Sequence, residues 1–436
     1  MAEANGSAEL PILIIGAGIT GLAIANGLHQ KGVPYIVFER DLSLSPRNGR
    51  DWGIACHWGT PLLAELLGDE KWSRVNSTLV DPHLPIKETE HFPLYNGKTG
   101  ELIFSTPVPR MHRILRSRMR ALQAEGLDIR YGKKLSDLEY SADGKSVTVH
   151  FEDGTSETGR LVIGADGSQS RVRTSLLGPE KAALKRLPVA ATFVNTSLPA
   201  EEARRLRASV HPIINGLVHP HNMMGMFAIL DASDAAHPEN WQFSVYISWP
   251  CSVEEQAAEA AAGIGLRERL QQGKEKSREF SDPLRRCYEL ISDDCEKVYY
   301  VTNGNWDPSL PEHDWDNRGG RATLVGDAAH PMTYHRGQGL NQSLGDAHAL
   351  VALLTKPEGR SQGELIDAFE AEMRPRTGEE VRQSEKNTLM LHNWEVVSKS
   401  PLLQRGVAYG SEGKSTTQPN TSRSNPETND GIQEEI

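Results

Sequence analysis

A glycine-rich turn between two short apolar runs constrains the fold of this 436-residue chain more than any other feature. Residues 11–40, PILIIGAGITGLAIANGLHQKGVPYIVFER, predict a buried strand, a turn, a helix and a second strand ending at Glu39. Three glycines stand at GxGxxG spacing in the turn: Gly16, Gly18 and Gly21. This spacing permits a tight turn, close approach of a pyrophosphate to the helix N-terminus, and close packing of the helix on the strand. Glu39, 18 residues after Gly21, is placed to accept hydrogen bonds from a ribose, and Arg40 follows it.

This βαβ unit predicts a bound dinucleotide, but it does not distinguish FAD from NAD, and a plain glycine-rich turn is the alternative. Two later segments make the distinction: LVIGADGSQSRVR at residues 161–173 and RATLVGDAAHPMTYHRGQGLNQSLGDA at residues 321–347. They resemble the two further fingerprints of the FAD-dependent aromatic-ring hydroxylases of the para-hydroxybenzoate hydroxylase family. The second resemblance extends over more than twenty residues and is the most specific signal in the chain.

The first of these segments contains the pair Asp166-Gly167. In the family, this pair lies at the position where the pyrophosphates of both FAD and NAD(P)H are bound. A strand that simply ends in a turn is the other interpretation, because Asp-Gly is a common turn pair.

The second segment implies several contacts with the flavin. Asp327, at a strand end, can accept a hydrogen bond from a ribitol hydroxyl. Gly337 and Gly339 let the backbone approach the isoalloxazine ring. The helix that begins near Leu340 and Asn341 directs its positive end at the pyrimidine edge, where it stabilises negative charge on reduction.

Arg113, in MHRILRSRM, matches the family arginine that reaches the FAD phosphate or ribityl chain, and Arg116 and Arg118 are alternatives. Any one of the three can also be ordinary surface charge. The earlier segment RDWGIACHWG resembles the family loop that contacts the flavin, which places Gly53 and Ile54 beside the isoalloxazine or ribityl chain. Trp52 or Trp58 can shield one face of the flavin or belong to the core.

The chain departs from the family pattern where Tyr334-His335 replaces the usual pair of proline and an aromatic residue. His335 is therefore a candidate hydrogen-bond donor or proton relay, with a solvent-facing loop histidine as the alternative. His330 matches a residue that is mainly structural in the family. The variant YHRGQG and the loop RDWGIACHWG also resemble flavin monooxygenases of fungal secondary metabolism.

Alternation in WQFSVYISW predicts a strand whose two faces differ. Phe243, Val245, Ile247 and Trp249 share the face that should join the core. Tyr246 lies on the other face, which borders solvent or a pocket, and it is the candidate for helping to deprotonate a phenolic substrate. His219 and His221 stand behind it as further candidates. The methionines of HPHNMMGMFAIL can line an adaptable apolar pocket for a bulky substrate.

The segments indicate an α/β fold in which a Rossmann-like FAD-binding domain contains an inserted substrate domain of antiparallel sheet plus helices. The predicted FAD-binding domain is split into residues 10–75, 109–183 and 306–385. The substrate domain comprises residues 76–108 and 184–305. A C-terminal helical segment at 386–404 and a disordered tail at 405–436 complete the chain.

Composition narrows the function to small-molecule chemistry. The net charge of −11 gives no basic surface for nucleic acid, and no apolar run is long enough to span a membrane. Four cysteines without CxxC spacing predict no disulfide framework and no metal site. A soluble, cytoplasmic protein of unknown oligomeric state is expected.

The resemblance implies a monooxygenase in which NAD(P)H reduces FAD and the reduced flavin reacts with dioxygen. The resulting hydroperoxide hydroxylates or epoxidises a small aromatic or polycyclic substrate. A flavoenzyme of the same fold that catalyses Baeyer–Villiger oxidation or oxidative ring rearrangement is the first alternative. Absence of a WxWxIP signature weighs against a halogenase. A non-catalytic flavin-binding regulator is the alternative from another class, and a test of NAD(P)H consumption separates it from the enzymes.

Overall fold

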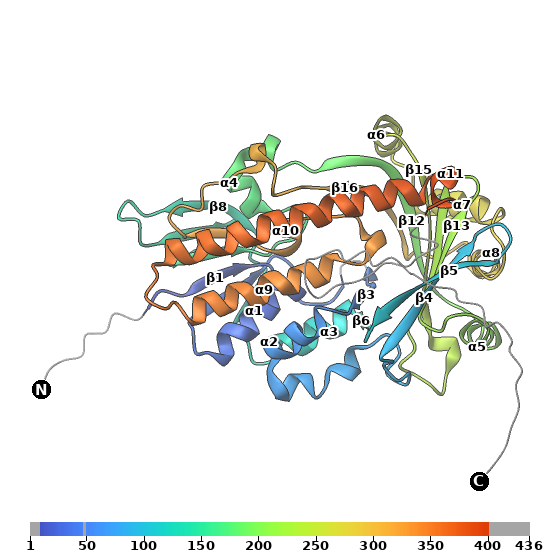
Figure 1. Ribbon diagram of the computed structural model, residues 1–436, viewed down its shortest axis with the longest axis horizontal. Coiled ribbons are helices and arrows are strands. Elements are labelled where there is room, and N and C mark those ends of the chain that lie inside the picture. The colour runs from blue at the N-terminus through green and yellow to red at the C-terminus, as the bar shows by residue number, and fades with distance from the viewer. Residues whose placement is uncertain (1–8, 47–48, 401–436) are drawn as a thin grey trace, which may run out of the picture.

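The computed structural model describes residues 9–46 and 49–400, so the tail predicted at 405–436 lies outside the described residues. The chain forms two domains that lie side by side and are bridged by one long helix, α10 (Figure 1). The predicted α/β fold class is confirmed. Among the described helices, none combines the length and apolar composition needed to cross a membrane.

The first domain is built on a five-stranded parallel sheet. Its strands, in spatial order, are β17 (Ala322–Leu324), β11 (Leu161–Gly164), β1 (Ile12–Ile15), β2 (Tyr35–Glu39) and β7 (Ile129–Tyr131). This order is that of a Rossmann-like fold, in which the sheet grows outward on both sides of β1. Because all five strands are parallel, the three fingerprint segments leave β1, β11 and β17 at the same edge of the sheet.

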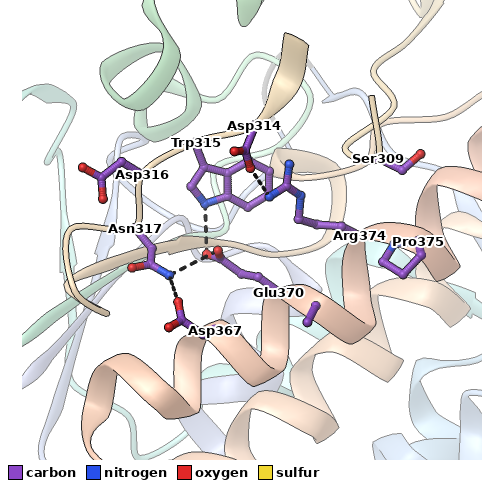
Figure 2. Close-up of a pocket in the computed structure, with 10 residues that line it drawn as sticks. Ser309, Asp314, Trp315, Asp316, Asn317, Asp367, Glu370, Arg374 and Pro375 are labelled. Atoms are coloured by element: carbon purple, nitrogen blue, oxygen red, sulfur yellow. Dashed lines mark hydrogen bonds and ion pairs between the residues drawn. The ribbon is translucent and has the colours of Figure 1, made fainter. Parts of the chain in front are cut away.

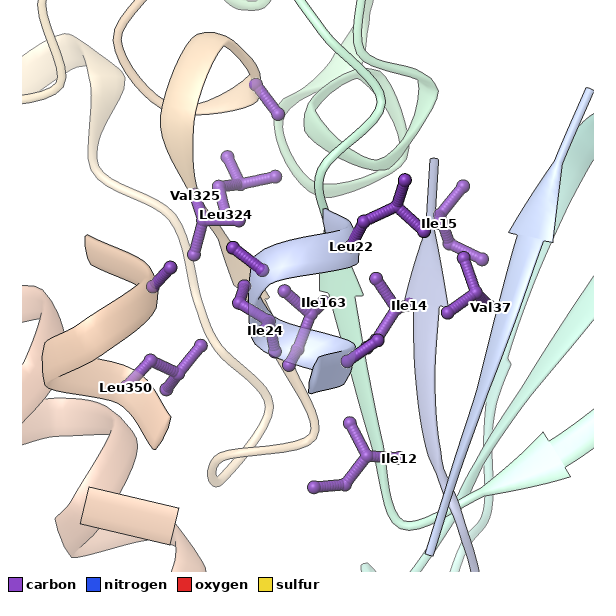
Figure 3. Packing of buried hydrophobic residues seen from close by; sticks show 14 of the residues in the cluster. Ile12, Ile14, Ile15, Leu22, Ile24, Val37, Ile163, Leu324, Val325 and Leu350 are labelled. Carbon is purple, nitrogen blue, oxygen red and sulfur yellow. The ribbon is translucent and has the colours of Figure 1, made fainter. Parts of the chain in front are cut away.

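Helices and a small second sheet cover the parallel sheet. The helices are α1 (Ile19–Gln30), α2 (Thr60–Trp72), α3 (Arg116–Ala124), α4 (Arg171–Lys181) and α9 (Gly339–Thr355). The small sheet contains β8 (Leu135–Tyr140), β9 (Val147–Phe151) and β10 (Ser156–Gly159). Figure 3 shows α1 packed between the strands and α9, with Ile14, Leu22, Ile163 and Leu350 in the shared core. These side chains are fully buried, which explains why the strands are continuous apolar runs.

The second domain is built on a seven-stranded sheet. Its strands, in spatial order, are β16 (Val298–Asn305), β12 (Lys185–Ser197), β15 (Gln242–Pro250), β14 (Met223–Asp231), β13 (Ile214–His219), β4 (Thr89–Asn96) and β5 (Leu102–Pro109). The predicted antiparallel pairing holds at every junction except β4 with β13, which is parallel. Strand β4 comes from an earlier segment of the chain and is not joined to β13 by a hairpin. The two strands can therefore run in the same direction.

The two faces of this sheet have different neighbours. Phe243, Val245, Ile247 and Trp249 belong to a buried cluster, as predicted. Three helices supply other members of that cluster: α5 (Ala200–Ser209), α7 (Leu266–Ser277) and α8 (Leu284–Leu290). A further helix, α6 (Val253–Ala261), packs beside β12. The opposite face, with Tyr246, turns toward the first domain.

Helix α10 (Gln362–Leu391) crosses the predicted boundary at residue 385 without interruption. It packs against α9 in the first domain and ends against the second (Figure 1). There Leu391, together with α11 (Trp394–Val397), packs on Leu94, Val218 and Met224. The polar face of β15 is consequently covered by protein.

Candidate active site

The glycine turn after β1 has a conformation that requires two of its glycines. Gly16 has a φ of +108°, and a Cβ there would lie 2.5 Å from the carbonyl oxygen of Ala165. A Cβ on Gly21 would lie only 2.1 Å from the carbonyl oxygen of Gly16. At Gly18 the nearest protein atom would be 4.0 Å away, so a diphosphate can approach the backbone there. Gly18 is also the N-cap of α1, and no side chain caps this helix end.

Glu39 lies at the carboxyl end of β2 and faces the glycine turn. Its carboxylate accepts hydrogen bonds from the backbone N–H of Ala17 and of Asp41, both at 3.0 Å. Arg120, which the sequence analysis missed, donates to the carbonyl of Ala17 at 2.8 Å and lies 3.4 Å from Glu39. Both side chains are buried and hold the turn in place. Arg40, by contrast, is exposed.

The three candidate arginines occupy different environments. Arg116 begins α3, stands 4.7 Å from the ring centre of Trp52, and experiences the charges of Asp51, Glu39 and Asp327. Burial nevertheless lowers its pKa to about 10. Arg118 instead donates to the carbonyl of Leu79 and to the hydroxyl of Ser233. The bond to Ser233 links the first domain to the second.

Arg113 lies on β6 (His112–Leu115), which pairs with β3 (Gly53–Cys56). A Cβ on Gly53 would lie 3.0 Å from Nε of Arg113, so this glycine makes room for the guanidinium. Alternation along β6 turns Arg113 and Leu115 toward the second domain and Ile114 toward the first. Of the three arginines, therefore, Arg116 is the one on which the charges of Glu39 and Asp327 act.

The Asp166 carboxylate serves as a helix cap. It accepts hydrogen bonds from the Ser170 hydroxyl at 2.5 Å and the Arg171 N–H at 2.6 Å, at the start of α4. Gly167 has a φ of +81°, which favours glycine in this turn. Arg173, which was not predicted, donates to the carbonyls of Ser168 and Ala328 and thereby ties the second fingerprint segment to the third.

Asp327 lies in the turn that follows β17. Its side chain is accessible, yet surrounding protein raises its pKa, although His330, Arg116 and Arg173 oppose this effect. A carboxylate that is accessible and also surrounded by protein atoms borders a cleft. Just before it, the N–H of Gly326 donates to the buried Asp346 at 2.8 Å.

The turn before α9 is fixed by internal hydrogen bonds. Gly337 has a φ of +64°, and α9 begins at Gly339. The Asn341 side chain accepts from the N–H of His57 and Gly59 and donates to the carbonyls of Ala55 and Gly337. All four positions of this amide are used, so Asn341, like the buried Leu340, can meet a cofactor only through its backbone.

Aromatic side chains form a cluster on the inner face of the second domain, which we call the aromatic chamber: Phe193, Tyr246, Tyr334, His335 and His392. The ring of Tyr246 lies 4.5 Å from Phe193, 5.7 Å from Tyr334 and 6.5 Å from His335 between centres. Tyr246 is 2% exposed, and burial raises the pKa of its phenol well above the ordinary value. Tyr246 therefore carries its proton, and its hydroxyl donates to Sδ of Met224 at 3.6 Å, a weak acceptor that a ligand oxygen can replace.

His335 belongs to this chamber and does not face solvent. Its Nδ1 donates to Thr388 Oγ1 at 2.9 Å, because the Thr388 hydroxyl itself donates to Thr333. Its Nε2 is buried and has no partner among the described residues. Burial and the nearby His392 hold its pKa well below the ordinary value, so the ring is neutral and Nε2 is an acceptor.

His219 and His221, the further candidates for this role, lie away from Tyr246. His219 is on the opposite face of the sheet, because its neighbour Val218 shares a face with Met224 and Ser248. Its Nε2 bonds to the carbonyl of Glu279, and its Nδ1 accepts from the N–H of His221. These two histidines and Glu279 are close enough to hold a metal ion, but both nitrogens of His219 are already engaged.

A separate hollow lies between α10 and the segment before β17, and it contains none of the fingerprint glycines (Figure 2). At its base, the buried Glu370 accepts hydrogen bonds from Trp315, Asn317 and Thr323. Burial raises the pKa of Glu370 to about 7, although these donors and Arg374 oppose the rise.

Substitution of Glu370 by Gln should change how stability depends on pH. Because the pKa of Glu370 is higher in the folded protein than in the unfolded chain, this group stabilises the fold at pH values below its unfolded-state pKa. This contribution is lost as the pH rises through about 7. The Gln variant should therefore gain up to about 3 kcal/mol relative to the native protein between about pH 4.5 and pH 8. Urea denaturation at both pH values measures this difference. Glu364→Gln on the same helix is the control and should move oppositely, because Ser361 lowers the pKa of Glu364.

A family model described as an FAD binding domain matches residues 9–272 and 313–384. The FAD-dependent monooxygenase phnB of Penicillium herquei is 37% identical over 406 residues, covering 92% of this chain and 95% of that protein. The FAD-dependent monooxygenase cctM of Talaromyces islandicus is 36% identical over 400 residues, covering 91% and 96%.

Solved structures share the fold at lower identity. HpxO of Klebsiella pneumoniae, complexed with FAD and uric acid, has a TM-score of 0.68 at 20% identity, covering 91% of this chain and 92% of that chain. The structure of 2,6-dihydroxypyridine-3-hydroxylase from Arthrobacter nicotinovorans has a TM-score of 0.69 at 19% identity, covering 88% and 93%. The family match over more than half of the chain, together with these relatives, places the protein among the FAD-dependent monooxygenases that carry this FAD-binding domain.

Proposed function

We propose that this monooxygenase uses NAD(P)H and dioxygen to insert one oxygen atom into a small aromatic or polycyclic molecule held in the aromatic chamber. The observation that carries the proposal is the meeting of the three fingerprint segments at one sheet edge, beside the chamber. The relatives' names support the reaction class, and a fold neighbour is a salicylate hydroxylase in a substrate complex. When bound, FAD supplies hydride acceptance from NAD(P)H and activation of dioxygen.

The residues at the sheet edge fit FAD. The backbone at Gly16, Gly18 and Gly21 and the end of α1 would hold the diphosphate, and Glu39 the ribose. Arg116 and Asp327 would contact the ribityl and phosphate portion, and Gly53, Ile54, Gly337, Gly339 and the backbone at Leu340 and Asn341 the ring system. Asp166 and Gly167 would shape the neighbouring turn, and the exposed Arg40 has the least support from its position.

The chamber residues would bind and orient the substrate. Phe193 and Tyr334 offer flat apolar surfaces for an aromatic ring and exclude water. Tyr246 would donate a hydrogen bond to a substrate oxygen, and Nε2 of His335 would accept one from a substrate hydroxyl. Tyr334 is 36% exposed, so this chamber aromatic is accessible to a ligand.

The test is a measurement of NADH and NADPH consumption by the FAD-loaded protein with a panel of phenols and polycyclic aromatics. A substrate that accelerates consumption and gains one atom from isotopically labelled dioxygen supports the proposal. Product structure separates hydroxylation or epoxidation from Baeyer–Villiger oxidation or ring rearrangement. FAD binding without any consumption of NAD(P)H would favour the non-catalytic regulator instead.

Tyr246→Phe should lower kcat/KM by about tenfold to a hundredfold, because one hydrogen bond to a substrate oxygen is lost. FAD affinity should not change. The matched control is Tyr300→Phe on the opposite face of the same sheet, where the hydroxyl donates to Glu259 at 2.6 Å. Equal effects of the two substitutions on kcat/KM would exclude the role assigned to Tyr246.

A further inference from the structure

Arg113 is a buried cation without a counter-ion. It is 7% exposed, and its Nε is buried without a hydrogen-bond partner. Within residues 9–46 and 49–400, no hydrogen bond or ion pair reaches its guanidinium. Arg116, Arg120 and Arg173, in contrast, each have acidic, carbonyl or aromatic partners. Burying an unpaired charge costs several kcal/mol, so such a group usually meets a ligand or another charge.

The side chain of Arg113 is directed toward the aromatic chamber. On β6 it shares a face with Leu115, which belongs to the core of the second domain. Its partner across the β3–β6 pair is Ala55, which packs on the same small buried cluster as Met226, a residue of the inner face of the seven-stranded sheet. Met226 stands directly opposite Tyr246 in the β14–β15 pair. Arg113 and Tyr246 therefore approach the same space from the two domains.

The charges near Arg113 agree with this placement. The carboxylates of Asp51, Glu39 and Asp327 act on Arg116, at the cofactor cleft. Burial lowers the pKa of Arg113 to about 10, and among the described residues Tyr246 is the ionisable group that acts on it. The guanidinium has donors and no acceptor, and the protonated phenol adds one further O–H donor.

We propose that Arg113 and Tyr246 together bind an anionic oxygen of the substrate, either an ionised phenol or enol or a carboxylate. This inference rests on the proposed function, because it names the substrate class of the same chamber. It moves Arg113 from the cofactor, where the family resemblance placed it, to the substrate. Arg113 is then a substrate-binding residue that favours the ionised form, since a charge-assisted hydrogen bond in a desolvated site stabilises the anion.

The experiment compares matched charged and neutral probes on the FAD-loaded full chain in the absence of NAD(P)H. The probes are 2-naphthoate against 2-naphthamide, and 4-nitrophenol against 4-nitroanisole. Calorimetry and the change in flavin absorbance report binding. Absorbance of bound 4-nitrophenol, at a pH below the pKa of the free phenol, reports whether the oxygen is ionised.

The native protein should prefer the charged member of at least one pair by about tenfold or more. Arg113→Met should remove this preference, Arg113→Lys should retain part of it, and FAD affinity should be unchanged in both. The pair that shows the preference distinguishes a phenolate from a carboxylate ligand. Arg186→Met is the surface control, because Arg186 is exposed and donates to the hydroxyl of Thr302.

Equal affinity for the charged and neutral members of both pairs, including failure of all four to bind, would overturn the inference. A charge preference that survives in Arg113→Met, or loss of FAD in that variant, would also overturn it. Absence of NAD(P)H consumption combined with an intact charge preference would contradict the proposed function alone, since these binding measurements need no turnover.

Discussion

Replacement of Gly18 by Ala is expected to weaken FAD binding by about a hundredfold, or about 3 kcal/mol, while the protein without FAD keeps its stability. The reason is that a Cβ at Gly18 meets no protein atom closer than 4.0 Å, but it would occupy the space proposed for the diphosphate. The added methyl group therefore obstructs the ligand and not the fold. Titration of the apoprotein with FAD, followed by flavin fluorescence, measures the loss.

Gly21→Ala is the contrasting substitution, because it should destabilise the protein even without FAD. Its Cβ would lie 2.1 Å from the carbonyl oxygen of Gly16, so α1 must move away from β1. The apoprotein itself should lose about 3 kcal/mol of unfolding free energy or more. Gly345→Ala in α9 is the control, because its Cβ would meet nothing closer than 3.4 Å. Equal loss of apoprotein stability in the Gly18 and Gly21 variants would refute the distinction between cofactor space and packing.

Asp346→Ala should cost about 3 to 5 kcal/mol of unfolding free energy. Asp346 is fully buried and bonds to His330 Nε2 at 2.6 Å, to Arg376 at 2.9 Å and to the N–H of Gly326. Its removal leaves the buried His330 without its carboxylate partner, takes one contact from the partly buried Arg376, and frees the turn before Asp327. FAD affinity should fall as well, because that turn carries Asp327, a proposed FAD contact.

Denaturant unfolding of the Asp346 variant and the native protein tests this expectation. Burial opposes ionisation of Asp346, but His330, Arg376 and the Gly326 N–H outweigh it and lower its pKa. The stabilisation is therefore present above the unfolded-state pKa and should be constant from about pH 5 to pH 8. Asp367→Ala, an exposed change that removes one bond to Asn317, is the control. A loss below about 1 kcal/mol at Asp346 would show that the network contributes little.

The sequence determined the parallel sheet, the glycine turns and the core face of β15. These features follow from local rules: only glycine fits the backbone at Gly16 and Gly21, and alternation along a strand assigns Phe243 and Val245 to the core. A long fingerprint such as residues 321–347 also fixes the start of α9 at Gly339, because the turn and the helix are neighbours in the chain.

Only the tertiary structure decided which polar groups lie at the proposed cofactor site and which lie at the aromatic chamber. Arg113 and Arg116 are three residues apart, yet the change from strand β6 to helix α3 sends them to different sites. Likewise the polar face of β15 is buried because α10 and the Tyr334-His335 turn, far along the chain, cover it. Such contacts depend on how two domains pack, and the local periodicity that reveals strands and helices carries no information about that packing.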